Sequence, residues 1–236
     1  MNPIVNILKK YPAAYRFLRF GLYARLKSAS RERIFRDAYQ KNLWNDAASV
    51  SGPGSNLVAT ENIRNALPDL LSRLEVTSLL DIPCGDFHWM SSVNLADVSY
   101  VGADIVAPLI QKNQELYGNR GKFLVADLVK DPLPRGDMIF CRDCLVHLSF
   151  REIELAIRNM AKTDAKFVAV TTFPSHPLNA DTVTPYWRAL NFETAPFQFP
   201  KPKELVRDFS DSQVNDQGKH LGIWTMEAVR EAIKSW

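Results

Sequence analysis

The sequence predicts an α/β domain built on a doubly wound, mostly parallel sheet. From residue 77 onward, five short apolar runs alternate with segments whose apolar residues follow a helical spacing. Runs that are apolar throughout are typical of parallel strands covered by helices on both faces. Polar side chains follow the first four runs, and a doubly wound sheet binds its ligand at that edge.

The composition is that of one globular domain, or of one domain with an appendage. The chain has 236 residues, of which 46% are hydrophobic and 23% charged, which excludes a wholly disordered or collagen-like chain. No apolar run reaches the length of about 18 residues that a membrane-spanning helix requires. Three clustered cysteines, Cys84, Cys141 and Cys144, argue against a secreted disulfide framework and favour a reducing, cytoplasmic compartment.

The first 48 residues are predicted to form a basic, amphipathic helical arm ahead of a domain that spans residues 49–236. Residues 1–36 hold nine Lys or Arg and one Glu, whereas the remaining 200 residues hold 20 basic and 25 acidic side chains. Apolar residues recur every three or four positions from Ile4 to Leu26, which places them on one helix face. Such a helix either packs on its own domain or lies on an anionic membrane surface, here the inner face.

Two further helices are predicted before the first strand, over Ser30–Asn45 and from Ser55 to Leu74. The segment Ser51–Ser55 contains serine, glycine and proline, which is typical of a turn, and Ser55 is placed to cap the helix that follows. The buried face predicted for that helix consists of Leu57, Ile63, Leu67, Leu70, Leu71 and Leu74.

Strands and helices are then predicted to alternate as far as residue 172. Beyond Phe173 the chain is rich in proline, and a long irregular segment in a compact domain is usually a lid or a binding loop. A closing pair of strands is predicted at Leu205–Phe209 and Leu221–Met226. The five earlier strands are Ser78–Asp81, Tyr100–Asp104, Phe123–Asp127, Met138–Cys141 and Phe167–Thr172, with helices at Pro108–Tyr117 and Phe150–Lys162.

The ends of the first four predicted strands carry the residues suited to a ligand. Gly85 follows the first strand and lets the backbone approach a ligand closely. Asp104 ends the second strand, 19 residues beyond Gly85, where an acid is placed to accept hydrogen bonds from a ribose. Asp127 follows the third strand, and Cys141–His147 follows the fourth. Four such ends at one edge of a sheet predict a nucleoside-type ligand.

Two longer runs in this region resemble a known family. They are Asp81-Ile-Pro-Cys-Gly-Asp-Phe-His-Trp-Met90 and Cys141-Arg-Asp-Cys-Leu-Val-His-Leu148. On these runs the chain, from about residue 44 to its end, is similar to class I S-adenosylmethionine-dependent methyltransferases, and within them to a bacterial subgroup. The resemblance implies a Rossmann-like sheet of seven strands, one of them antiparallel, with N-terminal helices. Pro83 and Phe87 depart from the family's first motif, which has glycine at both positions.

The resemblance also implies S-adenosylmethionine as the cofactor and assigns residues to it. Asp81 and Gly85 would line its methionine part, Asp104 would hold the ribose hydroxyls, and Asp127 would lie near the adenine amino group. Arg142, with Asp143, would face the reaction centre. The cofactor-binding residues carried over by position are Asp81, Pro83, Cys84, Gly85, Asp104, Ile105, Asp127, Leu128 and Arg142.

Methyl transfer to a hydroxyl needs a base, and His147 and Asp143 are the catalytic candidates. The methyl donor is already activated, so positioning and the exclusion of water supply much of the rate. His147 is suited to proton transfer near neutral pH. Asp143, four residues earlier, is predicted to pair with it if a helix or turn begins after Cys141. The alternative for His147 is a hydrogen-bonded core histidine.

Ser55, Trp89, Trp187 and Arg188 are predicted to contact the acceptor. Ser55 belongs to a segment before a predicted helix N-terminus, which is either an anion site or a plain turn. Trp187 and Arg188 lie in the proline-rich segment and suit a sugar or an anionic acceptor. The alternative for Trp187 is that it packs this segment onto the domain.

A metal site is the less favoured interpretation of the cysteines. Cys84, Cys141, Cys144 and His147 could converge on zinc at the ends of the central strands. No second Cys-x-x-Cys accompanies the pair at 141 and 144, and small buried cysteines are common. The sequence therefore predicts no metal.

The predicted function is methyl transfer from S-adenosylmethionine to a small-molecule or glycan acceptor, at an oxygen atom. One alternative is a non-catalytic regulator that binds the same cofactor. Another is a nicotinamide-dependent oxidoreductase, which would need Gly-x-Gly-x-x-Gly where Pro83–Phe87 stands. A nucleic-acid acceptor is not expected, because Cys141–Cys144 replaces the Asn/Asp-Pro-Pro-aromatic run of base methyltransferases.

Overall fold

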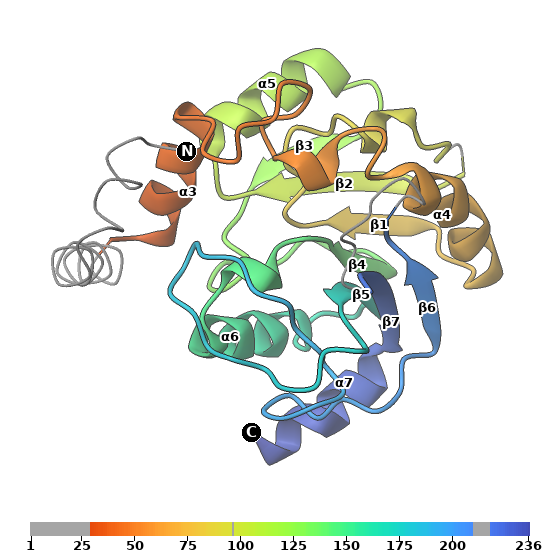
Figure 1. Cartoon of the computed structure of the whole chain (residues 1–236). Coiled ribbons are helices and arrows are strands. Elements are labelled where there is room, and N and C mark those ends of the chain that lie inside the picture. The colour runs from red at the N-terminus through yellow and green to blue at the C-terminus, as the bar shows by residue number, and fades with distance from the viewer. Residues whose placement is uncertain (1–28, 96, 210–217) are drawn as a thin grey trace, which may run out of the picture.

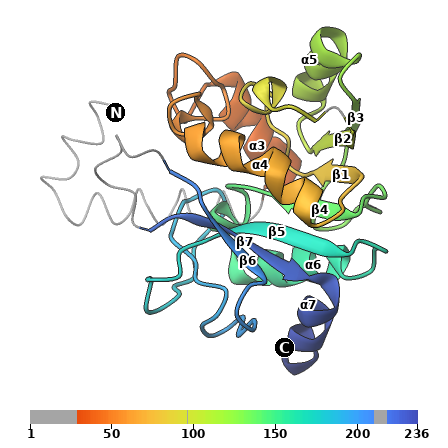
Figure 2. The same ribbon diagram turned by 90° about the vertical axis from the view of Figure 1, so that its right-hand side faces the viewer.

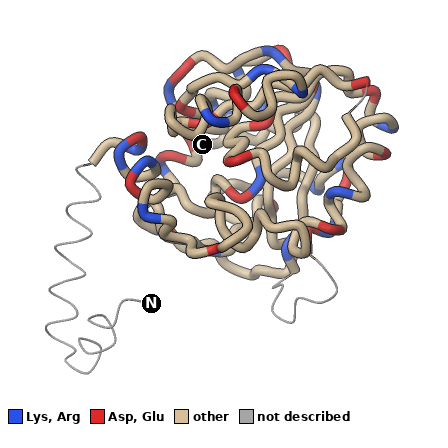
Figure 3. The backbone as a smooth tube through the Cα atoms, turned by 90° about the horizontal axis from the view of Figure 1, so that it is seen from above, with Lys and Arg blue, Asp and Glu red and all other residues tan. Residues whose placement is uncertain are grey.

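The computed structural model describes residues 29–95, 97–209 and 218–236. The predicted basic helix between Ile4 and Leu26 lies outside these residues. Along the described backbone, Lys and Arg are interspersed with Asp and Glu (Figure 3). No helix in this part of the chain is both long enough and apolar enough to cross a membrane.

A seven-stranded sheet in the order β3-β2-β1-β4-β5-β7-β6 forms the centre of the described chain (Figure 1). Neighbouring strands pair in parallel from β3 to β5, while β7 is antiparallel to both of its neighbours. The predicted sheet, mostly parallel with one antiparallel strand, is confirmed. The strands are β1 (Ser78–Asp81), β2 (Ser99–Asp104), β3 (Lys122–Val125), β4 (Met138–Cys141), β5 (Phe167–Thr172), β6 (Glu204–Arg207) and β7 (His220–Thr225).

Helices cover both faces of this sheet, with α4 and α5 on one side and α6 and α7 on the other (Figure 2). Successive strand residues face opposite layers: Leu79 packs in the cluster that contains Leu67 of α4, and Leu80 in the cluster that contains Ile153 of α6. Both faces of β1 are therefore buried, which is why its sequence is apolar throughout. The helices are α3 (Arg31–Gln40), α4 (Glu61–Arg73), α5 (Ala107–Tyr117), α6 (Phe150–Met160) and α7 (Met226–Ala232).

The helix predicted from Ser55 begins later than expected. Ser55 ends a short 3-10 turn, and α4 begins at Glu61. The side chain of Asn56 accepts a hydrogen bond from the backbone N–H of Ala59 at 2.8 Å, which holds the intervening residues in a turn. Ser55 therefore does not cap α4, and Leu57 is 42% exposed instead of lying on its buried face.

The helix predicted over Ser30–Asn45 is also shorter than expected. Ser30 caps α3, since its hydroxyl accepts a hydrogen bond from the backbone N–H of Arg33. The helix ends at Gln40 because Asn42 and Asn45 adopt left-handed backbone conformations, with φ of +43° and +52°. The remaining predicted strands and helices agree with the structure to within two residues at each end.

The proline-rich segment 173–203 contains no helix or strand, yet it is packed against the sheet. Phe192, Phe197 and Phe199 are buried. The ring of Phe192 lies 6.3 Å from that of Trp224 in β7, and the ring of Phe199 stacks on Trp236 at 5.8 Å. Much of the predicted lid is thus part of the core.

Candidate functional site

A cavity of about 750 Å³ lies at the carboxyl ends of the parallel strands. The strand order reverses between β1 and β4, and α/β sheets bind ligands outside such a point. The volume falls within the range of roughly 300–1,000 Å³ that is usual for cofactor sites. All residues predicted for the site line this cavity except Arg188.

The loop after β1 is shaped by Gly85 and held by Asp104 of β2. Gly85 adopts a left-handed conformation, with φ of +54°. Its N–H donates to Asp104 Oδ2 at 3.2 Å, and its carbonyl accepts from Asn113 Nδ2 of α5 at 2.7 Å. Asp104 Oδ1 accepts a further hydrogen bond from the N–H of Val106 at 3.0 Å. These hydrogen bonds fix the loop to β2 and α5 at the edge of the cavity.

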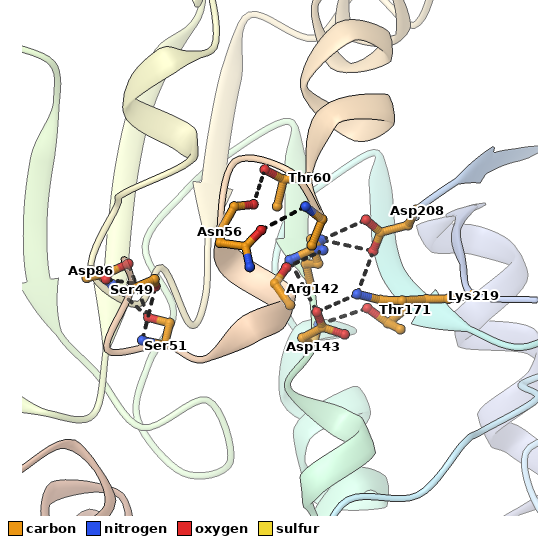
Figure 4. Close-up of polar contacts among 12 residues, drawn as sticks. Ser49, Ser51, Asn56, Thr60, Asp86, Arg142, Asp143, Thr171, Asp208 and Lys219 are labelled. Carbon is orange, nitrogen blue, oxygen red and sulfur yellow. Dashed lines mark hydrogen bonds and ion pairs between the residues drawn. The ribbon is translucent and has the colours of Figure 1, made fainter. Parts of the chain in front are cut away.

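A second loop, residues 49–55, is fastened to this one through Asp86 (Figure 4). Asp86 Oδ2 accepts hydrogen bonds from Ser49 Oγ at 2.8 Å and from the N–H of Val50 at 3.0 Å. Ser51 Oγ in turn accepts from the N–H of Asp86 at 3.1 Å. A Cβ atom on Gly85 would lie only 2.3 Å from Ser51 Oγ. The two loops therefore form one wall of the cavity, and glycine is required where they meet.

Two carboxyl groups in the cavity wall have raised pKa values. Burial raises the pKa of Asp81 to about 7, against the hydrogen bond that Tyr100 donates to it at 2.6 Å. Burial likewise raises the pKa of Asp104 to about 6, against the hydrogen bonds from backbone N–H groups. Both groups become more acidic when a cation binds beside them, because an adjacent positive charge favours the carboxylate.

Helix α3 closes the end of the cavity near β3. Arg31 Nη2 lies 2.7 Å from Asp127 Oδ2, and Arg31 Nη1 lies 3.3 Å from Glu152 Oε1 at the start of α6. Phe35 and Tyr39 of the same helix also line the cavity. The helix that the sequence assigns to the arm thus forms part of the site. The Asp127 carboxylate, expected near the adenine amino group, is held by Arg31.

Four charged side chains form a cluster on the opposite side of the cavity (Figure 4). Arg142 Nε donates to both oxygens of Asp208, at 3.0 and 2.9 Å, and Arg142 Nη1 lies 3.2 Å from Asp143 Oδ2. Lys219 Nζ lies 2.5 Å from Asp143 Oδ2 and 3.2 Å from Asp208 Oδ2. The Arg142 guanidinium also lies over the ring of Trp89, 5.2 Å from its centroid. Two cations and two carboxylates thus balance each other in this cluster.

Asp143 is poorly suited to the role of base. Burial alone would raise its pKa, but the charges of Lys219 and Arg142 lower it to about 2. The backbone of Asp143 is left-handed, with φ of +53°, and its N–H donates to Thr171 Oγ1 at 2.8 Å. The carboxylate is directed to Lys219 and not to His147, so the predicted pairing of Asp143 with His147 does not form.

His147 is placed and polarised as a proton acceptor. It belongs to a 3-10 turn after β4 (Leu145–His147) and lines the cavity. Its Nδ1 lies 3.0 Å from the carbonyl oxygen of Pro185, which can only accept a hydrogen bond, so Nδ1 carries the proton and Nε2 the lone pair. Burial lowers the pKa of His147 below its ordinary value, so the ring is neutral near pH 7.

Trp187 and Arg188, adjacent in sequence, have different surroundings. Trp187 lines the cavity, is 48% exposed, and packs edge-on against Phe173 with ring centroids 5.8 Å apart. The Arg188 guanidinium is turned away and donates to the carbonyl oxygens of Leu145, at 2.9 Å, and Leu148. Arg188 therefore fastens the segment that contains Trp187 to the turn that contains His147. The structure does not place it at the acceptor.

The cysteines do not assemble into a metal site within the part of the chain that the structure describes. No group of three or more His, Cys, Asp or Glu side chains is arranged there to hold a metal ion. Cys84 and Cys141 are buried, and burial raises the pKa of both thiols well above the ordinary value.

Several residues of the site do not appear among the sequence predictions. Arg31 and Asn113 carry no local signal, because their partners lie far away in the sequence. Asp208 and Lys219 could have been found: Asp208 directly follows β6, as the other acids follow their strands, and Lys219 directly precedes β7. Because β7 is antiparallel, its first residues lie at the same edge as the carboxyl ends of the other strands.

Comparisons with known proteins bear on the fold. No family model matches the sequence, and no curated protein matches it. The structure is similar to that of the N-methyltransferase NodS from Bradyrhizobium japonicum WM9 in complex with S-adenosylhomocysteine, with a TM-score of 0.56 and 17% identity over 80% of this chain and 97% of that chain.

Two further solved structures share the architecture. Magnesium protoporphyrin IX methyltransferase (ChlM) from Synechocystis PCC 6803 with bound SAM has a TM-score of 0.54 and 14% identity over 84% of this chain and 98% of that chain. The methyltransferase domain of bacterial CtHen1 has a TM-score of 0.53 and 13% identity over 71% of this chain and 98% of that chain. The described chain therefore has the Rossmann-like, seven-stranded fold of class I methyltransferases.

Proposed function

We propose that this protein transfers a methyl group from S-adenosylmethionine to a hydroxyl of a small-molecule or glycan acceptor. The observation that carries the proposal is that one cavity joins the strand-end acids Asp81 and Asp104 to a neutral histidine, His147. NodS and ChlM, which have the same fold, were solved with S-adenosylhomocysteine and SAM respectively. The fold and the cavity support the same class of cofactor here.

The residues of this chain fit such a cofactor. Gly85 lets the loop after β1 close against Ser51 of the loop at residues 49–55, and both loops line the cavity. Asp81 is a buried carboxylate that a cofactor ammonium would stabilise. Asp104 would accept hydrogen bonds from the ribose hydroxyls, and Ile105 and Leu128 would contact the adenine. When bound, S-adenosylmethionine supplies an activated methyl group for in-line displacement.

His147 would act as the base for the acceptor hydroxyl. Its Nδ1–H donates to the Pro185 carbonyl, which leaves the lone pair of Nε2 to accept the proton of the hydroxyl. Its lowered pKa keeps the ring neutral at the pH of the cell interior. Asp143 would not remove the proton. Its electrostatic partners, Lys219 and Arg142, make it a fixed anion whose negative charge favours the imidazolium that forms.

Calorimetric titration tests this proposal. We expect S-adenosylmethionine and S-adenosylhomocysteine to bind with micromolar dissociation constants, and NADH not to bind. Asp104→Asn, which keeps the shape of the side chain but removes its charge, should weaken binding at least about tenfold, equivalent to about 1.4 kcal/mol. Folded protein that binds neither sulfur nucleoside would contradict the proposal, and binding of NADH alone would favour the oxidoreductase.

A further inference from the structure

We infer that the acceptor is an uncharged ring that bears the reacting hydroxyl and lies against Trp187, with no carboxylate or phosphate near that hydroxyl. This inference rests on the proposed function, since it names the class of substrate for the same site. It is carried by the charges of the cavity wall, by the orientation of Arg188 and by the aromatic side chains around His147.

Carboxylates outnumber cations in the described wall of the cavity. The lining residues include Asp81, Asp86, Asp104, Asp127, Asp143 and Asp208 against Arg31, Arg142 and Lys219. His147 adds no positive charge because its pKa is lowered. An anionic acceptor would therefore enter a site of like charge, which disfavours binding.

The three cations of the described wall are all engaged by protein carboxylates. Arg31 is held by Asp127 and Glu152 at the adenine end. Lys219 and Arg142 are held within the four-residue cluster with Asp143 and Asp208. A carboxylate or phosphate on the acceptor would have to displace one of these buried partners and leave it unpaired, which is costly.

Arg188, the cation nearest to Trp187 in sequence, does not change this balance. Its guanidinium donates to the carbonyl oxygens of Leu145 and Leu148, and its backbone N–H donates to the carbonyl of Val146 at 3.0 Å. The side chain is absent from the cavity wall. Trp187 therefore lines the cavity, whereas the guanidinium of its neighbour Arg188 does not.

Aromatic rings surround the expected base. Trp44 packs edge-on to His147 with ring centroids 6.0 Å apart, and Phe173 packs against Trp187, which is fixed next to the His147 turn. All four side chains line the cavity. Trp187 is 48% exposed, so much of its ring is available to a ligand. Flat apolar walls of this kind suit a sugar ring or another ring with an apolar face.

An amine acceptor fits these charges less well than a hydroxyl. A protonated amine has no lone pair to receive the methyl group. The nearby carboxylates would raise the pKa of a bound amine and hold its proton in place. A neutral hydroxyl avoids this difficulty, because its proton passes to His147 Nε2 only as its oxygen forms the bond to the methyl carbon.

The test compares neutral and anionic probes that are otherwise alike. Protein saturated with S-adenosylhomocysteine is titrated, by ligand-observed NMR, with 4-nitrophenyl β-glucoside and β-galactoside and with the corresponding β-glucuronide and β-galacturonide. We expect at least one neutral glycoside to bind at least about tenfold more tightly than its uronide. Trp187→Ala should weaken that binding about tenfold, and Trp187→Phe should largely restore it. Tyr186→Ala is the control, because this neighbouring aromatic residue does not line the cavity, and it should leave the binding unchanged.

A further variant tests the charge argument directly. Asp143→Asn removes one carboxylate from Lys219 and should narrow the preference for the neutral glycoside. Equal or tighter binding of the uronides, or no binding of any glycoside to the S-adenosylhomocysteine complex, would overturn the inference while leaving the proposed cofactor intact. Failure of S-adenosylhomocysteine itself to bind would overturn the proposed function, and this inference with it.

Discussion

Asp81 and Asp104 are buried carboxyl groups whose pKa values of about 7 and about 6 lie near physiological pH. The ammonium of S-adenosylmethionine would favour the ionised form of Asp81, so below pH 7 binding has to expel a proton. We therefore expect the affinity to be constant above about pH 7.5 and to fall by up to about tenfold for each pH unit below 7.

Calorimetry between pH 5.5 and 8.5, in buffers of different ionisation enthalpy, would measure both the affinity and the proton release. Asp81→Asn should flatten the profile and abolish most of the proton release. An affinity of the unmodified protein that does not change with pH would show that Asp81 is not in contact with the cofactor's ammonium.

His147 offers a second prediction for a single residue. His147→Gln should lower the rate of methyl transfer by roughly 100-fold or more, the usual contribution of a general base, while S-adenosylhomocysteine binds as before. Because burial lowers the pKa of His147, the rate of the unmodified protein should fall only when the pH drops below the ordinary pKa of histidine. Full activity of His147→Gln would assign the ring to the core instead of to catalysis.

Among the elements, the loop after β1 depends on glycine for two separate reasons. Gly85 and Gly218 both have positive φ, of +54° and +71°. A Cβ on Gly85 would clash with Ser51 Oγ at 2.3 Å, whereas on Gly218 it would meet Ser175 Oγ at an ordinary 3.6 Å. Gly218→Ala should cost about 1 kcal/mol of stability from backbone strain alone, and Gly85→Ala should cost more and also weaken cofactor binding.

Chemical denaturation and calorimetry would separate these two effects. Equal losses of stability in the two variants, with cofactor affinity unchanged in both, would contradict the close approach of the loop at residues 49–55 to Gly85.

Helix α3 provides a prediction about how the cavity is closed. Arg31→Ala removes the ion pairs to Asp127 and Glu152, and hydrogen bonds to charged groups contribute about 1.5–3 kcal/mol each. Backbone amides of residues 31–40 should then exchange hydrogen about tenfold faster or more, and S-adenosylhomocysteine should bind more weakly. Arg33→Ala, at an exposed position of the same helix, is the control. Unchanged exchange would show that α3 is held by its apolar contacts alone.

At the scale of the whole molecule, the sheet could be predicted because each strand carries its own signal. Leu79 and Leu80 pack in opposite layers, so two adjacent apolar residues already indicate that both faces of the strand are buried. The acids at 81, 104 and 127 follow their strands, and parallel pairing brings them to one edge. These features depend on residues close together in the chain, which is why they could be read without coordinates.

The contacts that complete the site depend on pairs that are distant in sequence. Arg31 meets Asp127 across 96 positions, and Lys219 meets Asp143 across 76. No periodicity or motif reports such a pair. The pairing of Asp143 with His147, predicted from their spacing of four, was wrong for the same reason. The Asp143 carboxylate is bound by Lys219, which lies far away in the sequence.

The central claim is that the cavity binds S-adenosylmethionine with its methyl group directed toward His147. A crystal structure of the protein with S-adenosylhomocysteine tests it most directly. We predict that the ligand lies across the carboxyl ends of β1 and β2, with the ribose at Asp104, the homocysteine ammonium near Asp81, and the sulfur facing the side of the cavity that holds His147 and Trp187. A ligand bound elsewhere, or one whose sulfur faces away from His147, would contradict the account.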